Sequence, residues 1–371
     1  MIVDRDTAGG ASSEPPSMND GTSRRPCASR TWMFPGLAVL VAVVVALLAA
    51  EVGLRIFHHV RGTYRFHHEE ADEARRSSIW TRSDDPLLIY VHRPDYRKDG
   101  VRQTEAHGIL SPDDVSVDKP AGTLRILLLG DSIGAGLTLP FGERMSTLLE
   151  ARLEASLGRT VEVLNFSVNG YKTVQEARLL ETSAGRFDPD LILLAYCMND
   201  VANSLTPTVW FCEPPAPRVY LWEEVTERLG AAAENRELYV PTFGPHYGDS
   251  RYWHELYNVR SLGWQSVAEG FDRISWYGQE HGVRVLVVIF PFLLPEGWYR
   301  GGVEPLHRQV AAAARNRGFE MLDLLPVFAR YDAEDLRAEP EDLFHPNAEG
   351  HRIAAEAIHP RIVEMLKRRR R

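Results

Sequence analysis

Five short apolar runs alternate with helical patterns through the last two-thirds of the chain, from residue 124 onward. Nearly every position in each run is apolar, which is typical of parallel strands buried on both faces. The runs are "LRILLLG" from Leu124, "VEVLNF" from Val161, "DLILLAY" from Asp190, "VRVLVVIF" from Val283 and "FEMLDLL" from Phe319. Strands that alternate with helices predict a three-layer α/β/α sandwich around a five-stranded parallel sheet.

The helical patterns between these runs begin and end at residues that favour helix termini. Apolar residues at helical spacing cover residues 145–157, 261–279 and 303–317. The last helix is expected to begin after Asn347, because asparagine favours the N-cap position. Pro360 is expected to kink or end that helix, since proline cannot donate an i to i−4 hydrogen bond.

The N-terminal part of the chain has a different pattern. Residues 1–31 are rich in Gly, Ser, Pro and Asp and are expected to form a disordered tail. Residues 32–52 are almost entirely apolar and match the length that crosses a bilayer as a helix. A cleaved signal peptide is the alternative, although its apolar region is usually only about 7–15 residues long. We expect a retained single-pass anchor with the C-terminal part on the extracytoplasmic side, because long domains translocate largely regardless of charge.

The remainder of the chain divides into two regions. Residues 53–122 are polar, with scattered Pro, His and Arg, and are expected to form a membrane-proximal segment with little core of its own. Residues 123–371 contain all five apolar runs and are expected to form one domain. Within that domain, residues 203–260 lack periodicity and are rich in aromatic residues. Long loops are usually functional, so a lid or substrate wall is one interpretation, and a small aromatic subdomain is the other.

Composition narrows the classes of function. The formal net charge of −9 argues against a nucleic-acid partner, because a duplex binder needs a basic surface. Three cysteines are too few for a disulfide framework, so Cys197 and Cys212 either pair in an oxidising compartment or are buried thiols. The chain has no HExxH motif and no Cys/His cluster with ligand spacing, so no metal or other cofactor is expected.

The first apolar run ends in the turn "GDSIGAG", which begins at Gly130. A parallel sheet binds ligands at the carboxyl ends of its strands, so this turn is a candidate site. A dinucleotide fingerprint would read GxGxxG, and a phosphate loop would read GxxxxGK[ST]. The turn matches neither pattern. A nucleophilic serine is the other possibility, and it needs a base, a group that orients the base and donors for an oxyanion.

Each of these groups has a candidate at the end of a predicted strand or before the last helix. The second run leads into "NFSVNGYKT", where Gly170 offers a backbone N–H, and the third leads into "YCMND", where Asn199 offers an amide. Near the C-terminus, "DLFHPNAEGH" places Asp342 and His345 three residues apart, so that one turn can present both side chains.

These four blocks, in this order, resemble those of the SGNH/GDSL hydrolase family over about residues 124–366. The resemblance implies a flavodoxin-like fold and a Ser-His-Asp triad. Ser132 would be the nucleophile, His345 the general base and then the acid, and Asp342 the residue that orients the histidine. The oxyanion hole would comprise the backbone N–H groups of Ser132 and Gly170 and the side-chain amide of Asn199.

Other roles for the same residues remain open. The family usually has glycine two residues before the block-three asparagine, and Cys197 there could narrow the acyl pocket or tilt Asn199. Ser132 alone could serve as a helix cap, and Asn199 could merely end its strand. Asp131 is expected to bond to nearby backbone, and Asp200 is assigned to the turn.

The prediction from these observations is a membrane-anchored serine esterase that hydrolyses O-acyl esters through an acyl-serine intermediate. Its substrate would be a small-molecule, glycan or lipid ester, and its second partner the membrane. Two alternatives remain. An O-acyltransferase would pass the acyl group to an envelope glycan, and a binding module would keep the fold without the reaction.

Overall fold

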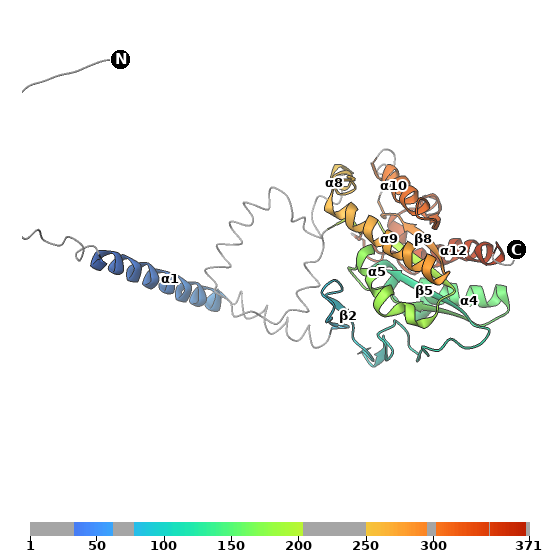
Figure 1. Ribbon diagram of the computed structural model, residues 1–371, viewed down its shortest axis with the longest axis horizontal. Helices are drawn as coiled ribbons and strands as arrows, with labels where there is room; N and C mark the ends of the chain where they lie inside the picture. The colour runs from blue at the N-terminus through green and yellow to red at the C-terminus, as the bar shows by residue number, and fades with distance from the viewer. Residues whose placement is uncertain (1–32, 62–77, 203–249, 295–301, 341, 369–371) are drawn as a thin grey trace, which may run out of the picture. The chain divides into compact units, whose positions relative to one another are not determined.

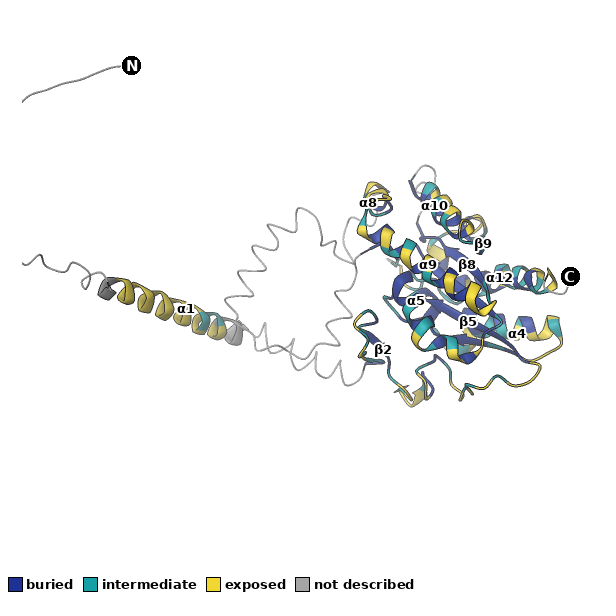
Figure 2. Ribbon diagram, in the orientation of Figure 1, coloured by how far each residue is buried: buried dark blue, intermediate teal, exposed yellow. Residues whose placement is uncertain are grey.

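The computed structural model describes residues 33–61, 78–202, 250–294, 302–340 and 342–368. The chain separates into two compact units, Met1–Phe57 and His58–Arg371. Helix α1 (Met33–Arg61) begins close to the predicted position and extends beyond the predicted end at residue 52. Its segment Gly36–Ile56 has a mean hydropathy of 2.7 and is long and apolar enough to cross a membrane. The apolar side chains of this segment are exposed (Figure 2).

The second unit is built on a five-stranded parallel sheet, as the sequence predicts (Figure 1). The sheet has the order β6-β5-β7-β8-β9, and each neighbouring pair is parallel. Its strands are β5 (Leu124–Gly130), β6 (Val161–Asn165), β7 (Leu191–Cys197), β8 (Arg284–Phe290) and β9 (Glu320–Asp323). The chain order reverses beside β5, and a parallel sheet opens a crevice for ligands at such a point.

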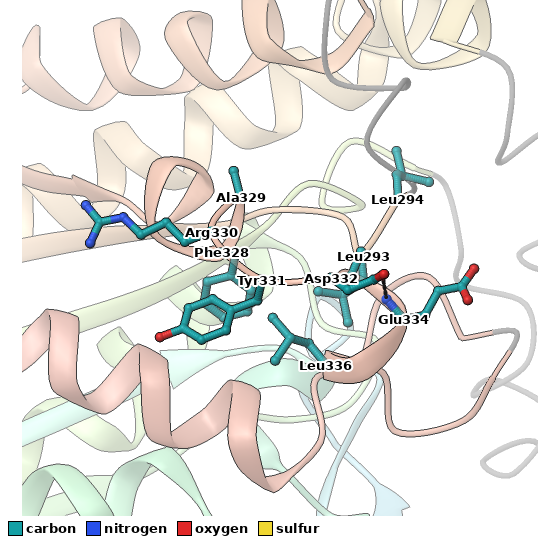
Figure 3. Close-up of a pocket in the computed structure, with 10 residues that line it drawn as sticks. Leu293, Leu294, Phe328, Ala329, Arg330, Tyr331, Asp332, Glu334 and Leu336 are labelled. Atoms are coloured by element: carbon teal, nitrogen blue, oxygen red, sulfur yellow. Dashed lines mark hydrogen bonds between the residues drawn. The ribbon is translucent and has the colours of Figure 1, made fainter.

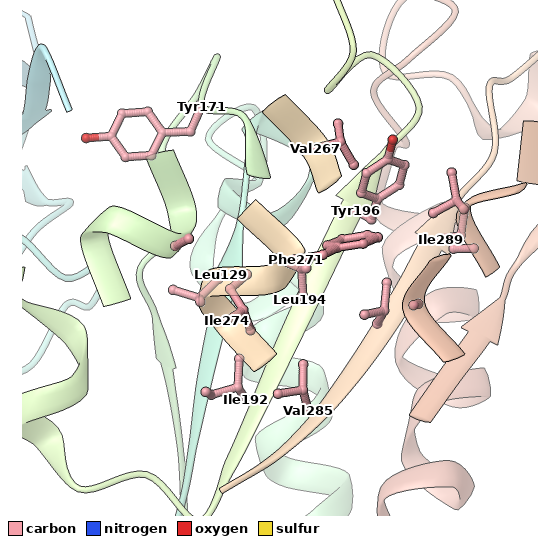
Figure 4. Packing of buried hydrophobic residues seen from close by; sticks show 14 of the residues in the cluster. Leu129, Tyr171, Ile192, Leu194, Tyr196, Val267, Phe271, Ile274, Val285 and Ile289 are labelled. Atoms are coloured by element: carbon pink, nitrogen blue, oxygen red, sulfur yellow. The ribbon is translucent and has the colours of Figure 1, made fainter. Parts of the chain in front are cut away.

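Helices cover both faces of the sheet. Helices α4 (Met145–Leu157) and α12 (Ala348–Arg368) pack on one face with Ile126 and Leu128 of β5. Leu127 and Leu129 point to the other face. That face is covered by α5 (Thr173–Thr182), α9 (Leu262–His281) and α10 (Glu304–Arg315). Figure 4 shows α9 placing Phe271 and Ile274 over the central strands.

Short elements complete the unit. They are β1 (Trp80–Arg82), β2 (Tyr90–His92), β3 (Arg97–Lys98), β4 (Val101–Arg102), α3 (Ser132–Ala135), α8 (Ser250–Leu256) and α11 (Leu325–Phe328), with short 3-10 helices at Phe141–Glu143, Ala184–Phe187 and Glu334–Leu336. The described residues 78–122 belong to the same compact unit as the sheet. Leu88, Tyr90 and Ile109 of this stretch are buried in the core that contains α5 and α9.

The last helix differs from the prediction at Pro360. Asn347 precedes α12 as expected, and its Oδ1 accepts a hydrogen bond from Gly350 N–H at 3.1 Å. However, the helix continues through Pro360 to Arg368, so of the two predicted outcomes, a kink or an end, the end does not occur. A helical proline costs about 3 kcal/mol, and burial of apolar side chains around it offsets that cost. The buried side chains are Ile358, Ile362 and Met365.

Most of the aromatic-rich stretch, residues 203–249, lies outside the described residues, as does the predicted tail at 1–31. The lid interpretation therefore stays a prediction. The described end of the stretch packs into the core. Trp253 lies with its ring centroid 4.5 Å from that of Phe292, and Tyr257 Oη donates to Met198 O at 2.9 Å.

Candidate active site

Ser132 lies on the sharp turn between β5 and α3. Asp131 caps this helix by accepting a hydrogen bond from Ile133 N–H at 2.9 Å, so Ser132 is the first helical residue and not the cap. Asp131 thus bonds to nearby backbone as the sequence suggested. Gly130 lets the end of β5 lie close to β7, because a Cβ there would lie 3.0 Å from both the Cβ and the carbonyl oxygen of Ala195. The serine hydroxyl therefore lies at the carboxyl end of β5, next to the point where the chain order reverses.

Asp342 and His345 are brought together by the loop that precedes α12. The N–H groups of Phe344 and His345 both donate to Asp342 Oδ1 at 2.9 Å. The other carboxylate oxygen, Oδ2, lies 2.7 Å from His345 Nδ1. One carboxylate therefore shapes the loop and fixes the imidazole ring at the same time, which is the arrangement that the three-residue spacing predicts.

His345 also reaches the serine. Its Nε2 lies 2.7 Å from Ser132 Oγ, although the two residues are 213 positions apart in the chain. Because Nδ1 faces a carboxylate, the neutral imidazole carries its proton on Nδ1 and leaves Nε2 to accept the serine proton. The structure thus joins a hydroxyl, an imidazole and a carboxylate in one hydrogen-bonded series.

Electrostatics stabilise the protonated form of His345. Burial alone would lower its pKa, but the hydrogen bond and charge of Asp342, with the charge of Asp131, raise the pKa above the ordinary value of 6.5. Burial likewise opposes the shift of Asp342, whose pKa falls below 3.8 because His345 and two backbone N–H groups stabilise the carboxylate. The histidine is therefore suited to take up a proton beside a carboxylate that stays ionised.

Gly170 and Asn199 follow the strands on either side of β5. Gly170 has φ +79°, a left-handed conformation that favours glycine, and its turn is closed by Tyr171 N–H to Val168 O at 3.0 Å. Among the described residues, the Gly170 N–H donates no hydrogen bond. The Asn199 side chain lies near the buried carboxylate of Asp131 and helps to stabilise its charged form. Both proposed donors thus lie, like Ser132, at the carboxyl ends of the strands.

A layer of buried polar side chains supports this edge. Asp200 lies in the turn after β7, as expected, but its Oδ2 also accepts a hydrogen bond from Thr173 Oγ1 at 2.6 Å, which the sequence did not indicate. Burial raises the pKa values of Asp131 and Asp200, and also that of Glu176 on α5. Cys197 is buried, forms no disulfide with a described residue, and has a thiol pKa that burial raises. Its possible partner Cys212 lies outside the described residues.

No three His, Cys, Asp or Glu side chains form a metal-binding group within the described ranges. A cavity of about 540 Å³ lies near the carboxyl ends of β8 and β9 (Figure 3). Leu293, Leu294, Phe328 and Leu336 give it apolar walls, and the loop at residues 329–334 completes its lining. Ser132, Asp342 and His345 do not line this cavity, so it is distinct from the hydrogen-bonded series.

Comparison with known protein families gives a match to this chain. Residues 128–353 match the model of the GDSL-like lipase/acylhydrolase family, a range that contains all five predicted site residues. A search of curated proteins gives no significant match.

Solved structures that match this chain are only distantly similar to it in sequence. TesA is 16% identical over 64% of this chain and 96% of its own, with a TM-score of 0.40. LAE5, an alpha/beta hydrolase enzyme from the metagenome of Lake Arreo, is 16% identical over 63% of this chain and 93% of its own, with a TM-score of 0.41. A mutant of Axe2, an acetyl-xylooligosaccharide esterase from Geobacillus Stearmophilus, is 15% identical over 63% and 92%, with a TM-score of 0.42.

Proposed function

Because this chain belongs to the GDSL-like lipase/acylhydrolase family and is an ester-hydrolysing enzyme, we propose that it is a serine esterase acting on O-acyl esters. The observation that carries the proposal is the hydrogen-bonded series from Ser132 Oγ through His345 to Asp342, with both links at 2.7 Å. A hydroxyl in this setting is an activated nucleophile.

In the first half of the reaction, Ser132 Oγ attacks the carbonyl carbon of the ester while His345 Nε2 takes the serine proton. The carbonyl electron pair moves onto its oxygen and forms an oxyanion. When the tetrahedral intermediate collapses, the bond to the alcohol oxygen breaks and that oxygen takes the proton from His345. The alcohol leaves, and the acyl group remains on Ser132.

In the second half, water attacks the acyl-serine and His345 takes a proton from it. The collapse of this intermediate returns the proton to Ser132 Oγ and releases the carboxylic acid. Asp342 keeps the imidazole oriented and stabilises its charged form in both halves. The N–H groups of Ser132 and Gly170 and the side-chain amide of Asn199 would donate hydrogen bonds to the oxyanion and stabilise it.

The direct test compares Ser132→Ala with the unchanged full-length protein in detergent micelles, using a p-nitrophenyl acyl ester. Loss of the nucleophile is expected to lower kcat by about 10³-fold or more. Ser156→Ala, which alters an exposed serine on α4, is the control and should retain full activity. Full activity of Ser132→Ala would refute the proposal.

The same experiment separates hydrolysis from acyl transfer. In the O-acyltransferase alternative, a glycan hydroxyl replaces water in attacking the acyl-serine. With a soluble oligosaccharide added, the esterase proposal expects free acid as the main product, whereas acylated oligosaccharide as the main product would support transfer.

The apolar segment of α1 supports a membrane location for this enzyme. Its length and hydropathy suit a retained single-pass anchor, and we place the esterase on the extracytoplasmic side of the membrane.

A further inference from the structure

A tyrosine from outside the family-matched range contacts the peptide that carries one proposed oxyanion donor. Tyr90 lies in β2, well before residue 128 where the match begins. Its side chain is 1% exposed, and its Oη donates a hydrogen bond to Asn169 O at 2.8 Å. The residue after Asn169 is Gly170, so the hydrogen bond is made to the carbonyl of the Asn169–Gly170 peptide.

That carbonyl and the Gly170 N–H belong to one planar group. Because the peptide bond is rigid, fixing the carbonyl oxygen also fixes the direction of the N–H on the opposite side. A hydrogen bond accepted by the carbonyl also polarises the group and strengthens the N–H as a donor. Within the described residues this N–H donates no hydrogen bond, so it is available to a ligand.

Further contacts hold β2 against the same segment. The hydroxyl of Tyr171, the residue after Gly170, donates to the carbonyl oxygen of Tyr90, and the two rings meet edge to face with centroids 5.3 Å apart. Gln175 on α5 donates through Nε2 to the carbonyl oxygens of Leu87 and Leu88, at 3.2 and 3.3 Å. Tyr90 is therefore fixed on both its backbone and its side chain.

The backbone next to Tyr90 is strained. Ile89 has φ +65°, which is an outlier for a β-branched residue. Tyr90 N–H donates to Leu88 O at 2.7 Å across Ile89, which closes a tight three-residue turn. Such strain persists only where the surrounding structure over-determines it, and it concentrates at functional sites.

From these contacts we propose that Tyr90 is a positioning residue for the oxyanion hole, acting through the Asn169–Gly170 peptide. The inference rests on the proposed esterase function. It assigns the chain N-terminal to the matched domain a part in catalysis, beyond linking the enzyme to its anchor.

The test is Tyr90→Phe in the full-length protein, which removes the hydroxyl and keeps the ring. Loss of one oxyanion donor typically lowers turnover by about 10²- to 10³-fold, so misorienting one donor is expected to lower kcat by about 10-fold with little change in KM. A trifluoromethyl ketone forms a serine adduct whose oxyanion occupies the hole. Its affinity should fall in parallel with kcat/KM.

Tyr277→Phe is the matched control, because Tyr277 Oη also donates to a backbone carbonyl, that of Gly185 at 3.1 Å. Rates are expressed per active site, titrated with a fluorophosphonate, so that loss of folded protein does not lower them. Unchanged kcat and unchanged ketone affinity in Tyr90→Phe would overturn the inference. If Ser132→Ala is inactive in the same assay, that result leaves the proposed esterase function intact, whereas activity of Ser132→Ala would remove both.

Discussion

At the scale of single residues, His345 is the group whose protonation controls the proposed reaction. The base must be neutral to accept the serine proton, so kcat/KM is expected to fall as the pH is lowered through the pKa of His345. That pKa lies above 6.5, because Asp342 and Asp131 outweigh the effect of burial. The activity should therefore be greatest on the alkaline side of neutrality.

Replacing Asp342 by asparagine tests this account of His345. The substitution removes the carboxylate that raises the histidine pKa, so the inflection in the pH profile of kcat/KM should move to lower pH. The plateau should fall by about 10⁴-fold, because an asparagine amide facing Nδ1 favours the tautomer with its proton on Nε2, which cannot accept the serine proton. The matched control is Asp332→Asn, which changes a carboxylate that bonds only to the nearby Glu334 N–H among the described residues. An unchanged inflection in Asp342→Asn would contradict this assignment.

The sequence predicts some of these residues better than others. Asp342 and His345 are three positions apart, so a single turn creates their contact, and Ser132 follows a strand that can be identified from its apolar run. The bonds from Tyr90 to Asn169 and from Thr173 to Asp200 join segments that only the packing of the whole unit brings together. The spacing of residues along the sequence does not predict contacts of this kind.

At the scale of elements, α9 packs very closely against two backbone segments that lie next to the site. A Cβ on Gly263 would lie 1.9 Å from Val201 O, in the turn that carries Asn199. A Cβ on Gly270 would lie 2.6 Å from Thr173 O, at the start of α5. Gly263 therefore lets α9 pack against the turn that carries Asn199, and Gly270 lets it pack against the start of α5.

Gly263→Ala is therefore expected to destabilise the protein and to lower kcat. Alanine gains about 1 kcal/mol of helix propensity over glycine, but the clash with Val201 typically costs about 1–3 kcal/mol and displaces the Asn199 turn. Urea unfolding and kcat would be measured beside Gly142→Ala, where a Cβ meets nothing within 4 Å. A Gly263→Ala protein as stable and active as the control would show that the turn accommodates the methyl group.

The strands and most helices could be predicted because their patterns are local. Runs that are apolar on both faces identify buried parallel strands, and the order of the five runs matches the observed strands. Pro360 is the exception. The sequence shows that Pro360 lacks an N–H. Whether α12 continues past it depends on how deeply the side chains around Pro360 are buried in the core.

At the scale of the whole molecule, the chain combines a hydrolase unit with an apolar N-terminal helix. The hydrophobic run of α1 could be predicted from its composition alone. By contrast, residues 78–122 lack periodicity, so the sequence did not indicate that Leu88 and Ile109 fill the core beside α5.

The anchor is tested by Val44→Arg in the full-length protein. An arginine near the centre of a spanning helix costs about 2.5–3.5 kcal/mol, so the variant should leave the membrane fraction or insert poorly. The unchanged protein and the Val44→Leu control should remain with the membrane after an alkaline wash. Intact mass of the recovered protein separates a retained helix from a cleaved signal. Recovery of the unchanged protein in the soluble fraction would contradict the anchor.

The central claim, that His345 activates Ser132 as the nucleophile, is tested most directly by covalent labelling. The full-length protein is treated with a fluorophosphonate, and the modified peptide is located by mass spectrometry. We expect one label per chain, on Ser132, with labelling that slows strongly in His345→Ala. A label on another residue, or equally fast labelling of Ser132 without the histidine, would contradict the account.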